Sequence, residues 1–478
     1  MGIDTYLTIC VLIVGIYMAW SIGANDVANA MGTSIGSGAL TLRQAVIIAG
    51  ILEFAGALLL GARVSKTMQS GLIDPSLFQA DYTILFFGMF AALLSTAIWL
   101  QIASYFGWPV STTHAIVGAI LGFGIIIAGV QTIQWGRIGS IALSWIISPG
   151  ISAIISYAIF SLLQKRILYA LNPVQATRKL IPLLVFLIFF TFIFSILFQE
   201  LHNISIHLNV VHSFLIACGA AAILSFISYF LLQKNPHITA SSSMPFSASS
   251  MQQLVSMNKA MKHLQRLKLA SKGQLKEKLS TILHESSTLR DQIQVQTHLY
   301  QSSSEYRIVE KLFSYLQIIS ACFVAFAHGA NDVANAIGPM SAAIDILRTG
   351  KLSPNAEIPT WILMLGGAGI ILGLATWGWR VIETVGKKIT ELTPTRGFSA
   401  EFGAAITIIV ASKAGLPIST THCIVGAVLG VGFAKGISGI NLRVLRDIAL
   451  SWIVTIPSSA ILCVIIFYML QWIFSSFL

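Results

Sequence analysis

The octapeptide Gly-Ala-Asn-Asp-Val-Ala-Asn-Ala occurs twice in this sequence, at residues 23–30 and 329–336. Each copy closes or follows an apolar stretch long enough to cross a membrane. Hydrocarbon offers no water to bind an amide or a carboxylate, so a polar cluster at this depth is costly to keep. Two identical copies therefore indicate two half-sites that meet around a polar ligand.

Each copy places an amide beside a carboxylate, with a second amide one helical turn later: Asn25, Asp26 and Asn29 in the first, Asn331, Asp332 and Asn335 in the second. Residues at i and i+4 share one face of a helix, so the two amides of a copy can converge on one ligand. Carboxylate and amide oxygens are hard ligands of the kind that Na⁺ takes, which makes Asp26, Asn29, Asp332 and Asn335 candidate Na⁺ ligands. The alternative is a helix N-cap, where Asn and Asp are common, but the duplication in apolar surroundings argues against it.

A second repeated segment, Pro-x-Ser-Thr-Thr-His, begins at Pro109 and again at Pro417. Proline favours the first turn of a helix, where N–H groups are not yet used by the helix and can bind a tetrahedral oxyanion beside the hydroxyls. Two such starts on opposed half-helices would surround one phosphate-sized anion. Alternatively, these hydroxyls only cap ordinary helices. The candidate anion ligands are Ser111, Thr112, Thr113, Ser419, Thr420 and Thr421.

Two histidines, His114 and His422, directly follow these hydroxyls. Histidine titrates near neutrality, so either ring could share a proton with the substrate or with a coupling ion. An equal alternative is that each ring only hydrogen-bonds a neighbouring helix.

Two acids, Glu53 and Glu401, lie within apolar segments and are ion-coupling candidates for that reason. They do not occupy matching positions in the repeats. Glu401 aligns with Leu93, and Glu53 aligns with about Gly366.

Composition predicts the class of protein that positions these residues. The 478 residues are 55% hydrophobic and only 10% charged, and their mean hydropathy is +0.81. Soluble domains carry about 25% charged residues. We therefore predict an all-α polytopic membrane protein of about twelve transmembrane helices. The expected spans lie near 4–24, 43–63, 81–105, 110–130, 137–163, 181–199, 210–233, 311–330, 360–385, 398–414, 418–435 and 445–475.

The two halves repeat in order, because a third segment, Ile-Ala-Leu-Ser-Trp-Ile at 141–146, recurs at 448–453. The three pairs are separated by 306, 308 and 307 positions, which indicates an internal duplication. Seven spans separate the repeat starts, and an odd number inverts one repeat relative to the other. If an interrupted pair (81–130 or 398–435) is a re-entrant helical hairpin, the number of spans changes by two and the number between the repeat starts stays odd. Inverted repeats are characteristic of secondary transporters.

We divide the chain into a first membrane repeat (1–165), connecting transmembrane helices (166–233), a basic polar cytoplasmic loop (234–309) and a second membrane repeat (310–478). The first span lacks the basic segment and cleavage pattern of a signal peptide, so we expect it to be retained.

Basic residues fall in loops that twelve spans would place on one side, which we assign to the cytoplasm, so both termini face outside. They are Lys165, Arg166, Arg178, Lys179, Lys387, Lys388, Arg396, Arg443 and Arg446, with seven more in the central loop. This asymmetry accounts for much of the net charge of +11, so no nucleic-acid partner is required. The central loop is either a solvated tether or a segment that touches anionic lipid.

These motifs closely resemble those of the inorganic phosphate transporter (PiT) family. The resemblance rests on GANDVANA near each repeat start and on P-[VI]-S-T-T-H-x-I-V-G further on, and it covers nearly all of 1–165 and 310–478. It implies a symporter that imports inorganic phosphate with a cation by alternating access. It also implies a homodimer of inverted-repeat protomers with hairpins that carry the Ser-Thr-Thr residues. By the same resemblance, Asn25 and Asn331 would contribute to the substrate site.

Several alternatives stay open at this point. Oxygen ligands favour Na⁺ as the coupling ion, whereas the histidines leave H⁺ open, and no cofactor beyond the ion is expected. A sulfate or metal–phosphate symporter would have the same architecture. A membrane-embedded hydrolase is remote, because nucleophilic catalysis needs one asymmetric constellation and this chain carries two equivalent ones. Short loops favour a multi-pass protein of a bacterial inner membrane.

Overall fold

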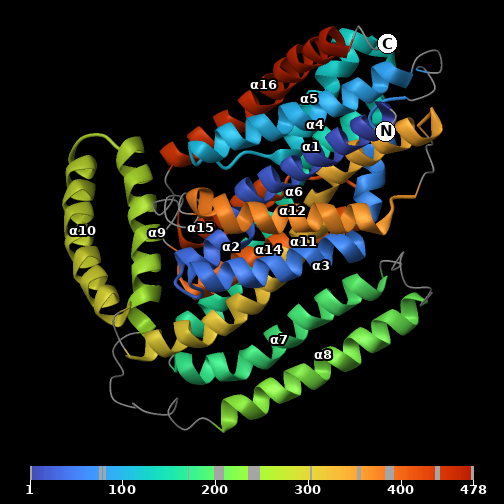
Figure 1. Ribbon diagram of the computed structural model, residues 1–478. Helices are drawn as coiled ribbons and strands as arrows, with labels where there is room; N and C mark the ends of the chain where they lie inside the picture. The colour runs from blue at the N-terminus through green and yellow to red at the C-terminus, as the bar shows by residue number, and fades with distance from the viewer. Residues whose placement is uncertain are drawn as a thin grey trace. The chain divides into compact units, whose positions relative to one another are not determined.

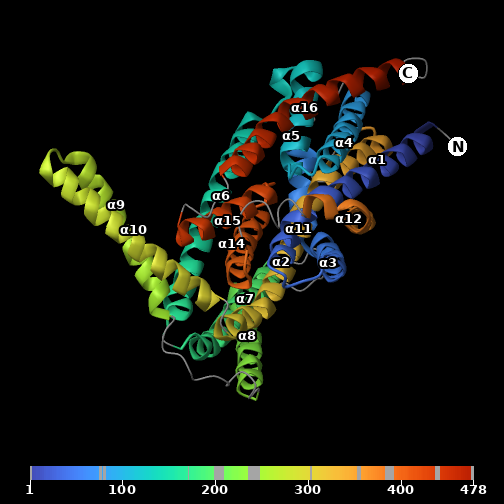
Figure 2. The same ribbon diagram turned by 90° about the vertical axis from the view of Figure 1, so that its left-hand side faces the viewer.

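The computed structural model describes residues 3–74, 78, 82–170, 172–198, 209–234, 248–301, 304–352, 357–382, 392–436 and 442–474 (Figures 1 and 2). Within them the chain is almost entirely α-helical, as predicted. The helices are α1 (Ile3–Asn25), α2 (Val27–Gly36), α3 (Leu42–Ser70), α4 (Tyr82–Tyr105), α5 (Thr112–Phe123), α6 (Trp135–Leu163), α7 (Pro173–Phe198), α8 (Val210–Gln233), α9 (Ala248–Ala270), α10 (Gln274–Gln301), α11 (Ser304–Thr349), α12 (Thr360–Trp377), α14 (Pro394–Lys413), α15 (Thr420–Lys435) and α16 (Leu442–Phe474).

Nine helical segments of the described chain are long and apolar enough to cross a membrane. The all-α membrane fold class is therefore confirmed, whereas the count of twelve spans is not. The difference lies in the two interrupted pairs. Helices α5 and α15 have 12 and 16 residues, fewer than the roughly 20 that a span needs.

Helix α14 does not qualify as a span either, because it carries Arg396, Glu401 and Lys413 in 20 residues. Arg396 was predicted to lie in a cytoplasmic loop, and that prediction is wrong. The same prediction is wrong for six further basic residues, which lie in helices rather than in loops: Lys165 and Arg166 in the helical turn Gln164–Leu168, Arg178 and Lys179 in α7, and Arg443 and Arg446 in α16. Arg396 belongs to the first turn of α14 and is buried. Lys387 and Lys388, predicted in the same loop, lie outside the described residues.

The chain forms two compact units. One covers Met1–Phe160, Phe190–Cys218 and Tyr315–Leu478, and it contains every candidate site residue. The other covers Ser161–Phe189 and Gly219–Ser314. It includes the hairpin of α9 and α10, which reverses at Gly273 in a left-handed conformation (φ +60°) and buries Leu279 and Ile293.

The two repeats are interleaved through glycines. A Cβ added at Gly23 of α1 would overlap the carbonyl oxygen of Ile370 in α12, and one at Gly329 of α11 would overlap that of Glu53 in α3. Each first helix of a repeat therefore packs on the second helix of the other repeat, at a separation that only small residues allow. Gly23 and Gly329 are repeat equivalents, so Glu53 corresponds to Ile370 rather than to about Gly366, as the sequence alignment had placed it.

The same exchange occurs at the later helices. Gly118 of α5 lies against the backbone of Ile456 in α16, and Gly426 of α15 lies against the backbone of Pro149 in α6. Both views show α5 running alongside α16 (Figures 1 and 2). Each short helix is thus supported by the last helix of the opposite repeat.

Contacts between α3 and α11 give the direction of the repeats. Gly56 meets Phe326, Gly61 meets Val333, and Gly338 meets Met68, so the two helices run parallel. Two consecutive spans of one chain must run in opposite directions, so α1 is antiparallel to α3 and therefore to α11. The two copies of the octapeptide enter the membrane from opposite sides, as inverted repeats require.

The glycine contacts generate a first prediction. Gly329→Ala places a methyl group into the Glu53 backbone, and overpacking of this kind costs about 1–3 kcal/mol. We expect a lower midpoint of thermal unfolding in detergent. The matched control is Gly139→Ala in α6, where a Cβ meets nothing within 4 Å. Equal midpoints for both variants would contradict the close packing of α3 and α11.

Candidate functional site

The candidate site is built around the first turns of α5 and α15. Ser111 and Ser419 are the N-cap residues, and their hydroxyls accept hydrogen bonds of 3.2 Å from the backbone N–H groups of His114 and His422. The capping alternative is therefore realised at both serines. A role for the two hydroxyls in anion binding stays a prediction, because an accepting hydroxyl still has a proton to donate.

The two helix starts meet head to head. The Thr113 hydroxyl donates to the carbonyl oxygen of Ile418 (2.8 Å), and the Thr421 hydroxyl donates to that of Val110 (3.2 Å). The residues that form these two bonds occupy equivalent positions in the two repeats, and each bond joins one repeat to the other. The first intrahelical bonds run from Ala115 N–H to Ser111 O and from Cys423 N–H to Ser419 O. The N–H groups before them therefore lie in the turn that binds anions in other proteins.

The octapeptides surround these helix starts. The hydroxyl of Thr420 donates to Asp332 (2.7 Å). The hydroxyl of Thr421 has one proton, which Asp26 (3.0 Å) and the carbonyl oxygen of Val110 share as acceptors. The amide of Asn335 donates to the hydroxyls of Thr112 (3.0 Å) and Thr113 (3.2 Å). The structure thus brings together the predicted anion ligands and most of the predicted ion ligands, although they lie up to 395 residues apart in sequence.

Asn25 and Asn331 support the turns that lead into α5 and α15. The Asn25 amide donates to the hydroxyl of Ser104 (2.9 Å) and to the carbonyl of Trp108 (3.1 Å). The Asn331 amide makes the equivalent bonds to Ser412 (3.0 Å) and Leu416 (3.2 Å). Both amides therefore orient the hairpin turns, a role that the sequence did not predict. The side chain of Asn29 lies outside the described residues, so its convergence with Asn25 stays a prediction.

The two octapeptides differ in backbone. The first lies at a break between α1 and α2, at Asp26, whereas α11 continues without interruption through the second. The half-sites are therefore equivalent in sequence but not in local conformation.

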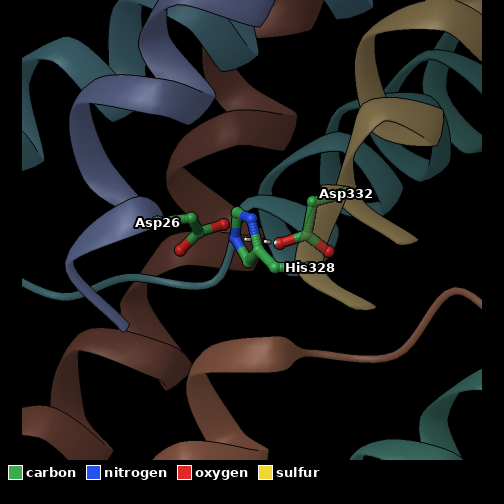
Figure 3. Close-up of side chains that lie close together, drawn as sticks. All are labelled: Asp26, His328 and Asp332. Atoms are coloured by element: carbon green, nitrogen blue, oxygen red, sulfur yellow. Dashed lines mark ion pairs between the residues drawn. The ribbon is translucent and has the colours of Figure 1, made fainter. Parts of the chain in front are cut away.

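A histidine that the sequence analysis missed lies at the centre of the carboxylates. His328 Nε2 lies 2.9 Å from Asp332 Oδ2, and its Nδ1 lies 3.1 Å from Glu53 Oε1. Figure 3 shows the ring between Asp26 and Asp332, and ligand atoms of these three residues lie within 4.8 Å of one another. All four side chains are at most 1% exposed. The first copy of the octapeptide is preceded by Ile22, so comparison of the repeats passes over His328.

Buried oxygen atoms near this cluster suit a cation. Asp332 Oδ1, Asn331 Oδ1 and Asn335 Oδ1 have no hydrogen-bond partner among the described residues. A buried carbonyl or carboxylate oxygen without a donor carries a desolvation cost, which a Na⁺ ion or an ordered water offsets. These donor atoms are of the type predicted for Na⁺.

Glu401 has a separate environment. Its carboxylate accepts hydrogen bonds of 2.6 Å from the hydroxyls of Thr33, Ser34 and Ser320, and one of 3.1 Å from the amide of Gln317. These donors tie α2, α11 and α14 together. The predicted ion-coupling role of Glu401 thus stays a prediction, whereas its four partners give it a structural role.

Known proteins resemble this chain over nearly its whole length. The profile of the phosphate transporter family matches residues 22–463. A putative phosphate permease of Chlamydia trachomatis is 45% identical over 471 residues, which are 98% of this chain and 99% of that protein. Inorganic phosphate transporter 2-1, chloroplastic, of Arabidopsis thaliana is 43% identical over 99% of this chain and 73% of its own length. The solved structure of a sodium-dependent phosphate transporter is similar with a TM-score of 0.79 and 35% identity, covering 98% of this chain and 100% of that one.

The histidine–carboxylate cluster generates a second prediction. Removing one partner of a buried pair costs about 3–5 kcal/mol, because the other charge stays buried and uncompensated. We expect His328→Gln and Glu53→Gln each to destabilise the protein, and the double variant to lose less than the sum of the two. Thermal unfolding of the purified variants measures this coupling.

The matched control combines His328→Gln with Glu401→Gln, because Glu401 has other partners. Losses in that pair should simply add. Additive losses for the His328 and Glu53 pair would contradict their direct interaction.

Proposed function

Because this chain belongs to the phosphate transporter family, we propose that it imports inorganic phosphate together with Na⁺ by alternating access. Membership makes the chain a transporter rather than an enzyme, which removes the hydrolase alternative. Family membership also favours phosphate over sulfate or a metal–phosphate complex as the substrate.

The observation that carries the proposal is the meeting of two helix starts from opposite repeats, with their hydroxyls on Asp26 and Asp332. Phosphate would bind to the hydroxyls and N–H groups of the two Ser-Thr-Thr turns, where both helix dipoles favour an anion. A carboxylate beside the anion would accept a hydrogen bond from the protonated phosphate oxygen. Sulfate has no such proton at neutral pH, which gives a physical basis for selectivity.

The choice of Na⁺ rests on the donor atoms and on a relative. Buried carboxylate and amide oxygens of Asp332, Asn331 and Asn335 suit a hard monovalent cation. The similar solved structure is that of a sodium-dependent transporter. Na⁺ is here a transported substrate, which binds and leaves in each cycle.

Coupling follows from competition for the same oxygens. The hydroxyls of Thr420 and Thr421 donate to Asp332 and Asp26, so they are not available to phosphate. A cation on these carboxylates takes up their negative charge and weakens them as acceptors. The hydroxyls can then turn to phosphate, whose own charge no longer meets two bare carboxylates. Cation binding would in this way precede and permit anion binding.

Alternating access would use the inverted repeats. The bonds from Thr113 to Ile418 and from Thr421 to Val110 close the two half-sites on each other, and their near-equivalence allows the site to open toward either side. Glu53 and Asp332 would stay paired through His328 in the state described here.

Orientation and assembly belong to the same proposal. We propose that the protein lies in a bacterial inner membrane with both termini outside. The orientation rests on the distribution of basic residues. Labelling of cysteines introduced at the two termini, in intact cells, measures this orientation. The homodimer rests on the family resemblance, and cross-linking in the membrane tests it. The division into 1–165, 166–233, 234–309 and 310–478 is kept as a description of the repeats.

The experiment that tests the function is uptake of radiolabelled phosphate into proteoliposomes, first with a Na⁺ gradient and then with a pH gradient. We expect uptake that depends on Na⁺ and resists an excess of sulfate. Uptake driven by the pH gradient alone would replace Na⁺ by H⁺. Entry of sulfate without phosphate would overturn the substrate.

The competition for hydroxyls generates a further prediction. Thr421→Val removes a hydroxyl at nearly constant volume and should raise the KM for phosphate about tenfold or more, since a hydrogen bond to a charged group is lost. The matched control is Thr407→Val, because the buried hydroxyl of Thr407 donates to the carbonyl oxygen of Gly403 in its own helix. An unchanged KM for Thr421→Val would place phosphate elsewhere.

A further inference from the structure

The third repeated segment has no part in the phosphate or cation contacts described above. It places Trp145 in α6 and Trp452 in α16, at equivalent positions of the two repeats. Both tryptophans contact the histidines that end the Pro-x-Ser-Thr-Thr-His segments. All three duplicated segments are therefore connected through α5 and α15.

Four rings form this contact, and we call Trp145, Trp452, His114 and His422 the ring cluster. The imidazole of His422 stacks on Trp452, with centroids 3.6 Å apart and planes at 29°. The imidazole of His114 lies 3.9 Å from the ring of Trp145. The two imidazoles meet edge to face, 4.5 Å apart and at 85°. Each histidine thus contacts the tryptophan of its own repeat and the histidine of the other.

Polar bonds fix two of these rings, those of His422 and Trp145, to the backbone of the opposite repeat. His422 Nδ1 lies 3.3 Å from the carbonyl oxygen of Trp145, which can only accept, so Nδ1 carries the proton. The indole N–H of Trp145 lies 3.4 Å from the carbonyl oxygen of Pro417, two residues before Ser419. Trp145 of the first repeat therefore contacts both the turn and the first helical residues that carry the anion ligands of the second.

Neither histidine has a described carboxylate within ion-pair distance, unlike His328. Both are at least 95% buried among rings and backbone. Their surroundings suit neutral imidazoles that pack against rings, with one hydrogen bond at Nδ1 of His422, rather than rings that exchange protons with the carboxylates.

We propose that the ring cluster positions the phosphate site by fixing the distance between the N-termini of α5 and α15. The proposal rests on the proposed function, because it assigns no contact with phosphate to the cluster. His114 and His422 lie one helical turn from the capping serines, so a change in ring contact moves the hydroxyls of both Ser-Thr-Thr turns. Interiors are packed closely, and stacked rings resist compression and separation. The cluster thereby sets the size of oxyanion that fits.

The test compares Trp145→Ala with wild type for phosphate and for arsenate, whose bonds to oxygen are longer. We expect the KM for phosphate to rise about tenfold, and the arsenate inhibition constant to rise less, so that selectivity shifts toward the larger anion. The half-saturating Na⁺ concentration and the pH profile should stay unchanged. Trp145→Phe keeps an aromatic ring and should restore most of the phosphate affinity.

The matched control is Trp99→Ala, since Trp99 is another partly buried tryptophan whose indole bonds to Thr455. It should leave the KM and the anion selectivity as in wild type. If Trp145→Ala does not fold, His422→Gln removes the stacked ring with a smaller loss of volume.

An unchanged KM and anion selectivity in folded variants would overturn the proposal, and so would a shifted pH profile in place of shifted selectivity. Absence of uptake by wild type in the same vesicles would instead reject the proposed function. The two failures are therefore distinguishable.

Discussion

The head-to-head contact between α5 and α15 is the interaction on which the rest of the site depends. Thr113 and Thr421 each donate to a carbonyl in the turn that precedes the other helix, so neither helix start is complete alone. The octapeptides supply the carboxylates and amides on one side of this contact, and the rings of Trp145 and Trp452 pack on the histidines that follow it. The proposed anion site needs two positive helix ends close together, which repel each other unless bonds across the repeats hold them.

Burial of charge is the second constraint. Glu53, Asp26, Asp332 and His328 are enclosed in a region where an isolated charge is very costly, and they remain there because each lies beside another. Such a cluster is sensitive to any added cation or proton, since the total charge of the group decides its stability. Under the proposed function, a transported ion would act on this cluster without a large movement of the backbone, and such a local event biases a two-state equilibrium.

Much of this arrangement could be predicted from duplicated sequence, because polar residues kept twice at membrane depth have few purposes other than a shared site. The threonines and aspartates indeed meet. His328 could not be found in that way, since Ile22 stands at the equivalent position. The role of Asn25 depends on a turn about 80 residues later, and Glu401 depends on hydroxyls more than 360 residues away, so both require the tertiary fold. Hydropathy overestimated the spans at α5 and α15 because it measures apolarity without reporting where a helix stops.

The pairing of α3 with α11 also bears on how the protein is made. Glu53 is synthesised 275 residues before His328, its partner, which at ~5–20 residues per second is roughly 14 to 55 seconds. During that interval the first half lies in the bilayer with an acidic group and glycine-lined helix faces that nothing yet covers. Until the second half is inserted, these helices are exposed to non-native association and to proteolysis. A substitution in the second repeat would therefore affect the first repeat during biogenesis, before any transport takes place.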